Sequence, residues 1–148
     1  MSDPHPSMVV MFDHWDAFDA LGGWTVRWSR TGRGGLCRWS ERVIVLPPGL
    51  SQRTERSVLS HEVVHAERGP FPRWMLAREE ELVSRESARR LIPIMALGEA
   101  LAWSLDPEQV ADELHVDVPT LLARLRGLHP SERAFLMRRL EHHHESAA

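Results

Sequence analysis

The chain has 148 residues, of which 43% are hydrophobic, and this composition suits one compact domain with a real core. Its formal net charge of −3 argues against a nucleic-acid-binding protein, because such proteins are usually basic. The single cysteine, Cys37, cannot form an internal disulfide, and the sequence shows neither a signal-peptide pattern nor about 18 consecutive apolar residues, so we expect a cytoplasmic protein without a membrane span.

The N-terminal third of the chain predicts a short helix followed by a small sheet. The helix is expected over residues 13–21, where Gly22 and Gly23 end it. Strands are expected over residues 24–29, 36–39 and 42–46, with a glycine-rich turn at 31–35 and a short connection at 40–41. We expect these three strands to form a small antiparallel sheet.

The remainder of the chain predicts helices. They are expected from the Ser51 cap to about residue 67, over 74–92 and 95–104, from the Asp106 cap to 114, over 119–127, and after a Ser131 cap. Pro93 is the best candidate for a domain boundary. The predicted fold class is therefore α+β, with residues 1–93 as the first domain, 94–141 as a small all-helical, helix-turn-helix-like module, and 142–148 as a disordered tail.

The pentapeptide His61-Glu62-Val63-Val64-His65 lies in the first long helix and matches the H-E-x-x-H pattern of zinc peptidases. Residues i and i+4 lie one turn apart on the same helix face, so the imidazoles of His61 and His65 can converge on one ion. Glu62 is offset from that face, and its carboxylate can act as general base on a water molecule. The helix break at Gly69 leaves room for a substrate beside the second histidine.

A catalytic zinc needs a third protein ligand. The next helix supplies four candidates, namely Glu79, Glu80, Glu81 and Glu86. Glu80 shares a mostly apolar stripe with positions 76, 83, 87 and 91, which predicts a face packed against the first helix. Glu79 is nearly as well placed, whereas Glu81 and Glu86 are better partners for nearby arginines. We therefore predict a Zn²⁺ site formed by His61, His65 and Glu80, with Glu79 or Glu81 as the alternative third ligand.

Three segments together resemble a known family. They are Ser60-His61-Glu62-Val63-Val64-His65, Glu80-Glu81-Leu82-Val83-Ser84 and Ala88-Arg89-Arg90-Leu91-Ile92-Pro93. They resemble the ImmA/IrrE metallo-endopeptidases, in the forms found in actinobacteria and their phages. Counting back thirteen residues from Pro93 places that family's ligand glutamate on Glu80. The likeness covers roughly residues 24–93 and is weaker beyond them.

The resemblance implies a fold and a function. It implies a zincin-like metallopeptidase domain in residues 1–93, with a short sheet, an HExxH helix and a second helix that carries the glutamate. It also implies a gluzincin-like zinc peptidase that acts on regulatory proteins, typically phage or mobile-element repressors of the helix-turn-helix type.

Other side chains near the motif have weaker claims. The chain has no tyrosine to stabilise an oxyanion, so Arg68 and Arg73 are candidates for that role. Phe71 and Trp74 could line a substrate cleft. Cys37 fits a half-buried strand position better than a fourth zinc ligand.

The C-terminal residues carry the last functional hint. Residues 110–121 resemble a helix-turn-helix, but residues 96–148 hold five arginines and nine acidic residues, a net charge of −4 that disfavours contact with phosphates. We therefore expect a zinc-dependent endopeptidase that cuts a peptide bond in a regulatory protein, with Glu62 as the general base. One alternative is a zinc-containing protein that docks to a regulator without peptidase activity. A less favoured alternative is a helix-turn-helix DNA-binding regulator.

Overall fold

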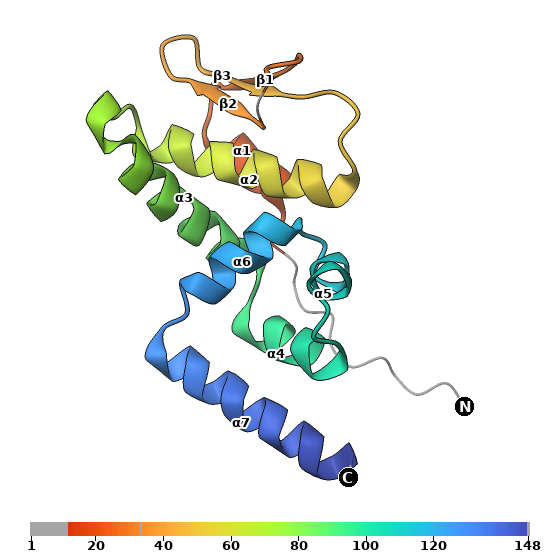
Figure 1. The fold of residues 1–148 in the computed structure, drawn as a ribbon. Helices are drawn as coiled ribbons and strands as arrows, with labels where there is room; N and C mark the ends of the chain where they lie inside the picture. Colours follow the sequence, from red (N-terminus) through yellow and green to blue (C-terminus); the bar gives the residue numbers. More distant parts are fainter. Residues whose placement is uncertain (1–11, 33, 148) are drawn as a thin grey trace.

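The computed structural model describes residues 12–32 and 34–147 of the chain. Over this part it contains a three-stranded sheet, seven α-helices and one short 3-10 helix (Figure 1). The expected α+β fold class is confirmed. None of the helices in the described part is both long and apolar enough to cross a lipid bilayer.

The sheet differs from the expected one in the direction of a strand. Its strands are β1 (Thr25–Trp28), β2 (Leu36–Arg38) and β3 (Val43–Leu46), in the spatial order β1-β3-β2. β2 and β3 are antiparallel neighbours, as expected for a hairpin, but β1 pairs with β3 in parallel. The prediction of a purely antiparallel sheet is therefore wrong. Because β3 lies between the other two strands, all four of its residues are buried.

Two helices pack on the sheet. They are α1 (His14–Ala20) and α2 (Gln52–Arg68), which contact each other, while α2 also contacts β2 and β3. The carboxylate of Asp13 caps α1 and the hydroxyl of Ser51 caps α2, so both helices begin where the sequence predicts. Ile44 of the sheet packs with Leu59 and Val63 of α2 in the first hydrophobic cluster. This packing orients the remaining face of α2 away from the sheet.

A second long helix crosses α2. The segment expected to form one helix over residues 74–92 is divided into a 3-10 turn, η1 (Arg73–Met75), and α3 (Leu76–Leu91). α3 contacts α2 along one side and a helix of the C-terminal part along another. These contacts bury Val83 and Ser87, as the apolar stripe predicts.

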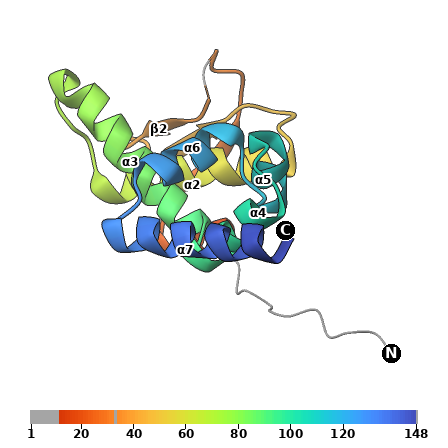
Figure 2. The ribbon, with the colours of Figure 1, turned by 60° about the horizontal axis from the view of Figure 1, so that its bottom comes forward.

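Four further helices complete the fold. They are α4 (Ile94–Trp103), α5 (Pro107–Glu113), α6 (Val118–Arg126) and α7 (Pro130–Ala147). They form a second hydrophobic cluster within residues 91–136, and Figure 2 shows α7 lying along α4. α6 returns to pack against α3. α7 continues through the histidine triplet to Ala147. Residues 142–147 are therefore helical, although the sequence predicted a disordered tail from residue 142.

Two buried arginines connect the C-terminal helices to the rest of the chain. The guanidinium of Arg56 on α2, which is 6% exposed, donates to the carbonyls of Leu114 and His115 at 3.2 and 3.0 Å. Arg124 on α6 is 3% exposed, and its Nε donates to the carbonyl of Ile92 at 2.8 Å. Buried guanidinium groups need such partners, so these bonds fix where α5 and α6 sit on the first part of the chain.

Candidate metal centre

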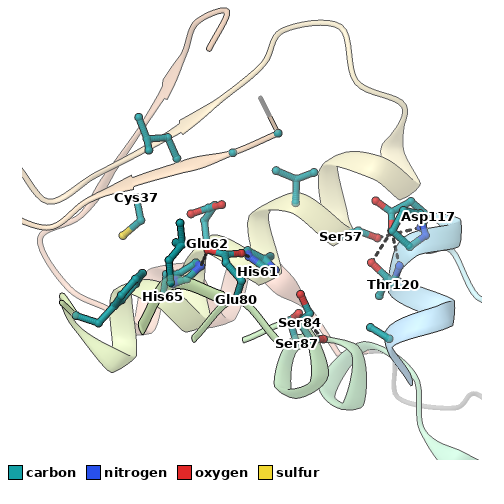
Figure 3. A pocket seen from close by; sticks show the side chains of 18 of the residues that line it. Cys37, Ser57, His61, Glu62, His65, Glu80, Ser84, Ser87, Asp117 and Thr120 are labelled. Carbon is teal, nitrogen blue, oxygen red and sulfur yellow. Dashed lines mark hydrogen bonds and ion pairs between the residues drawn. The ribbon is translucent and has the colours of Figure 1, made fainter. Parts of the chain in front are cut away.

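The two histidines of the motif meet one glutamate from the next helix. His61 and His65 lie one turn apart on α2, and Glu80 lies in the second turn of α3 (Figure 3). The Nε2 atom of His61 is 2.9 Å from one carboxylate oxygen of Glu80, and Nε2 of His65 is 2.8 Å from the other. The three candidate ligand atoms lie within 4.8 Å of one another. These three residues could hold a metal ion.

The donor set suits a transition-metal ion such as zinc. Two imidazole nitrogens and one carboxylate oxygen are ligands that zinc accepts, and a tetrahedral site with bonds of about 2.0–2.1 Å places such atoms roughly 3.3 Å apart. Hydrogen bonding to His61 lowers the pKa of the Glu80 carboxyl against the opposing effect of burial. Its carboxylate is therefore in the ionised form that a metal ligand requires.

The neighbouring glutamates are held elsewhere. Glu79 is buried and forms two hydrogen bonds with the guanidinium of Arg68, one of them at 3.1 Å. Glu81 pairs with Arg85 at 2.9 Å and with Arg126 at 3.4 Å. Within the described residues, the structure thus brings Glu80 to the histidines and commits the two alternative ligands to arginines.

Aromatic packing orients His65. Its ring is stacked on Phe71 at a centroid distance of 5.9 Å and meets the edge of Trp39 at 6.2 Å. The indole N–H of Trp39 also donates to the backbone carbonyl of His65 at 2.9 Å. The Nδ1 atom of His65 is buried and has no hydrogen-bond partner in the part of the chain that the structure describes. Trp39 and Phe71 therefore orient this ring together with Glu80. The sequence indicated Phe71 only as a residue of a substrate cleft, and it did not indicate Trp39.

Glu62 lies beside the ligand group without joining it. Its side chain reaches the same cavity and is 6% exposed (Figure 3). Burial raises the pKa of Glu62 to about 7, with the charge of His61 opposing this rise and that of Glu80 adding to it. A carboxyl group with a pKa near neutrality can accept and return a proton, as a general base must. A cation held by the three ligands would lower this pKa.

A glycine makes room for Glu62. A Cβ atom at Gly35, just before β2, would lie 2.6 Å from Cγ of Glu62 and 2.9 Å from a methyl group of Val58. Such distances are too short for non-bonded carbon atoms, so any larger residue would displace the glutamate. Gly35 is therefore part of the site, and the sequence pattern of a glycine-rich turn did not indicate this role.

The centre opens into a cleft of about 600 Å³. β2, α2, α3 and α6 line it, so residues from both sides of the expected domain boundary contribute. Cys37 faces the cleft near Glu62 but is not part of the ligand group (Figure 3). Burial raises the pKa of its thiol to about 12, with a further contribution from the charge of Glu62, so the thiol stays protonated at neutral pH.

The arginines considered for an oxyanion do not reach the cleft. Neither Arg68 nor Arg73 is among its lining residues, and Arg68 is occupied by Glu79. Phe71 does line the cleft, whereas Trp74 is 83% exposed and lies outside the lining. The geometry therefore does not place either arginine at the cleft, and the expectation for the two aromatic residues holds for Phe71 only.

Comparisons of the chain with family models, with curated proteins and with solved structures find no match. The resemblance to the ImmA/IrrE peptidases thus stays a prediction from residues on α2 and α3. A functional assignment has to depend on the geometry of the cleft and on the chemistry of the side chains that line it.

Proposed function

We propose that this protein is a zinc-dependent endopeptidase that hydrolyses a peptide bond in a regulatory protein, such as a phage or mobile-element repressor. The observation that carries the proposal is that His61, His65 and Glu80 share one open cleft with a buried Glu62 that lies outside this ligand group. A purely structural metal site uses four protein ligands, whereas three ligands leave a position for water or substrate.

The residues of the cleft have distinct tasks in this reaction. His61, His65 and Glu80 would hold the ion, which when bound supplies a Lewis acid that polarises the scissile carbonyl and activates water. Glu62 would take the proton from the attacking water and pass it to the leaving amine. Burial of Glu62 suits it to both transfers, because it raises the pKa of the carboxyl and so opposes the lowering that a bound cation would cause.

The test is the substitution Glu62→Gln. The amide keeps the size of the side chain but cannot accept a proton, so zinc should remain bound while peptide hydrolysis falls by about 10²–10⁴-fold. Metal analysis measures the zinc, and incubation with helix-turn-helix regulators encoded in the same genome measures the cleavage. His61→Ala serves as the comparison and should lose both the bound zinc and the cleavage. Full cleavage by Glu62→Gln, or a wild-type protein without zinc, would contradict the proposal.

A second candidate function is docking to a regulator without hydrolysis. It is favoured by two exposed apolar side chains, Trp74 of η1 at 83% and Leu76 at the start of α3 at 49%, because such side chains are common in protein interfaces. The same variant separates the two functions. A docking protein would keep its biological effect in Glu62→Gln and lose it in Trp74→Ala.

A further inference from the structure

The cleft continues beyond the metal centre to an end formed by three helices. Ser57 lies one turn before His61 on α2, and Ser84 lies one turn after Glu80 on α3. Asp117 and Thr120, at the start of α6, close this end (Figure 3). One helical turn is about 5.4 Å long, so a side chain of a substrate bound at the centre can reach these groups.

The hydrogen bonds of Ser57, Asp117 and Thr120 use the hydroxyl and backbone donors of these residues and leave acceptors free. The hydroxyl of Ser57 donates to the carbonyl of Arg53 at 2.9 Å, and the hydroxyl of Thr120 donates to Oδ1 of Asp117. The backbone N–H of Asp117 donates to Ser57 at 3.0 Å, and that of Thr120 donates to Oδ1 of Asp117. No hydrogen bond reaches Oδ2 of Asp117 from the described residues. A ligand that supplies donors is therefore matched to this end of the cleft.

The charge of the residues that line the cleft also favours a positively charged ligand. Among the described residues that line the cleft there is no arginine, whereas Asp117 lies at the far end and Glu62 and Glu80 lie at the centre. The nearby guanidinium of Arg53 is paired with Glu108 at 2.8 Å. Two glutamates can be balanced by a divalent ion. The charge of Asp117 interacts with Arg53 outside the cleft lining and with His61 at the centre, but no arginine of the described cleft wall neutralises it.

The remaining wall is apolar. Val58 of α2 and Pro119 and Ala123 of α6 line the cleft beside these polar groups. Long basic side chains bury their methylene groups against apolar atoms and place the charged end on polar partners. A path of apolar atoms that ends at one carboxylate and several hydroxyl oxygens therefore fits an arginine or lysine side chain.

We infer that this end of the cleft is a specificity pocket for a basic residue of the peptide substrate, whose guanidinium or ammonium group binds Asp117. The inference rests on the proposed peptidase function, because it assumes that a peptide lies across the metal centre. Arginine is the better match of the two, since its five N–H donors exceed the three of lysine and can contact Asp117 and the hydroxyl oxygens together.

The experiment removes the charge of Asp117 but keeps its structural role. Asp117 is also the N-cap of α6, and asparagine caps helices as well as aspartate does, so Asp117→Asn should fold. The probe is a set of dye-labelled hexapeptide pools in which one position holds arginine, its neutral isostere citrulline, or leucine, and the other positions are mixed. Binding to the zinc-loaded protein is measured by fluorescence polarisation in a Glu62→Gln background, where hydrolysis does not interfere.

At one position, the arginine pool should bind about tenfold more tightly than the citrulline pool, and Asp117→Asn should abolish the difference. The matched control is Asp106→Asn, which removes the same charge from the exposed N-cap of α5, outside the cleft, and should keep the preference. If Asp117→Asn does not fold, the experiment uses Asp117→Ser instead, because serine also caps helices.

Two results overturn the inference, namely equal binding of the arginine and citrulline pools at every position, and a preference for arginine that survives in Asp117→Asn. These results are distinct from a failure of the proposed function. If the pocket prefers arginine but wild-type protein cleaves none of the peptides, the binding pocket stands and the peptidase proposal fails. If wild-type protein cleaves peptides without a preference for arginine at any position, the peptidase proposal stands and the pocket fails.

Discussion

Gly35 is the residue on which the position of Glu62, the proposed general base, depends most directly. An alanine there would place its Cβ atom 2.6 Å from Cγ of Glu62, and the glutamate would have to move. We predict that Gly35→Ala leaves the zinc content unchanged, lowers kcat/KM by about tenfold or more, and destabilises the fold by about 1–3 kcal/mol through overpacking. Metal analysis, peptide hydrolysis and urea denaturation measure the three effects.

The neighbouring Gly34 supplies a matched control. A Cβ atom at Gly34 would meet nothing within 4 Å, and its backbone does not require a glycine. Gly34→Ala should therefore behave like the wild type in all three measurements. Equal activity of the two alanine variants would show that Gly35 does not set the position of Glu62.

Single residues of the site were predictable from the sequence when they share a local pattern. The motif indicated His61, Glu62 and His65 through their spacing, and the apolar stripe of the next helix indicated Glu80. Trp39 was not indicated as a partner of His65, because the two are 26 positions apart and meet only through tertiary packing. The same reason applies to Gly35 and to the polar end of the cleft.

At the scale of elements, the candidate metal centre depends on how α3 packs against α2. The guanidinium of Arg68, at the end of α2, binds Glu79 in the first turn of α3 and so fixes the neighbouring Glu80 opposite the histidines. We predict that Glu79→Ala lowers zinc affinity by about tenfold, because loss of groups that support metal ligands costs 10–100-fold. Glu80→Ala should cost more, since it removes a ligand itself.

Glu81→Ala is the control for this series. It removes the same side chain from the next position, where the carboxylate contacts Arg85 and Arg126 outside the centre. Its zinc affinity, measured by competition with a chromophoric chelator, should equal that of the wild type. If Glu79→Ala or Glu81→Ala lost more zinc affinity than Glu80→Ala, Glu80 would not be the third ligand.

The elements themselves were predictable to different degrees. Helix starts followed from side-chain caps such as Ser51 and Asp106, whose effect is local. The parallel pairing of β1 with β3 did not follow from the sequence, because the order of short strands in a sheet depends on packing between distant segments. The extension of α7 past residue 142 was missed because a run of histidines does not prevent a helix.

At the scale of the whole molecule, the C-terminal helices are part of the site. Asp117 and Thr120 of α6 line the cleft, although they lie beyond the boundary expected at Pro93. Arg124 of α6 binds the carbonyl of Ile92 at the end of α3 and the carboxylate of Glu132 on α7. This arginine therefore connects α3, α6 and α7, and its charge is balanced by Glu132.

The pairing with Arg124 makes the stability of the fold depend on pH. The hydrogen bonds from Arg124 lower the pKa of Glu132 to about 2 in the folded protein, against a burial effect in the other direction, from an ordinary value of 4.5. A depressed folded-state pKa means that the carboxylate stabilises the fold fully above about pH 4.5 and loses this contribution as the pH falls towards 2.

We therefore predict that Glu132→Gln destabilises the fold by about 3 kcal/mol at pH 7, where it leaves the buried Arg124 without a counter-charge. The difference in unfolding free energy between wild type and variant should stay constant above about pH 5 and shrink by about 1.4 kcal/mol per pH unit below pH 4. Urea denaturation of both proteins at a series of pH values measures this difference in unfolding free energy. Glu141→Gln, an exposed position on the same helix, should show no such dependence, and equal pH profiles for the two variants would refute the role of the Arg124 pair.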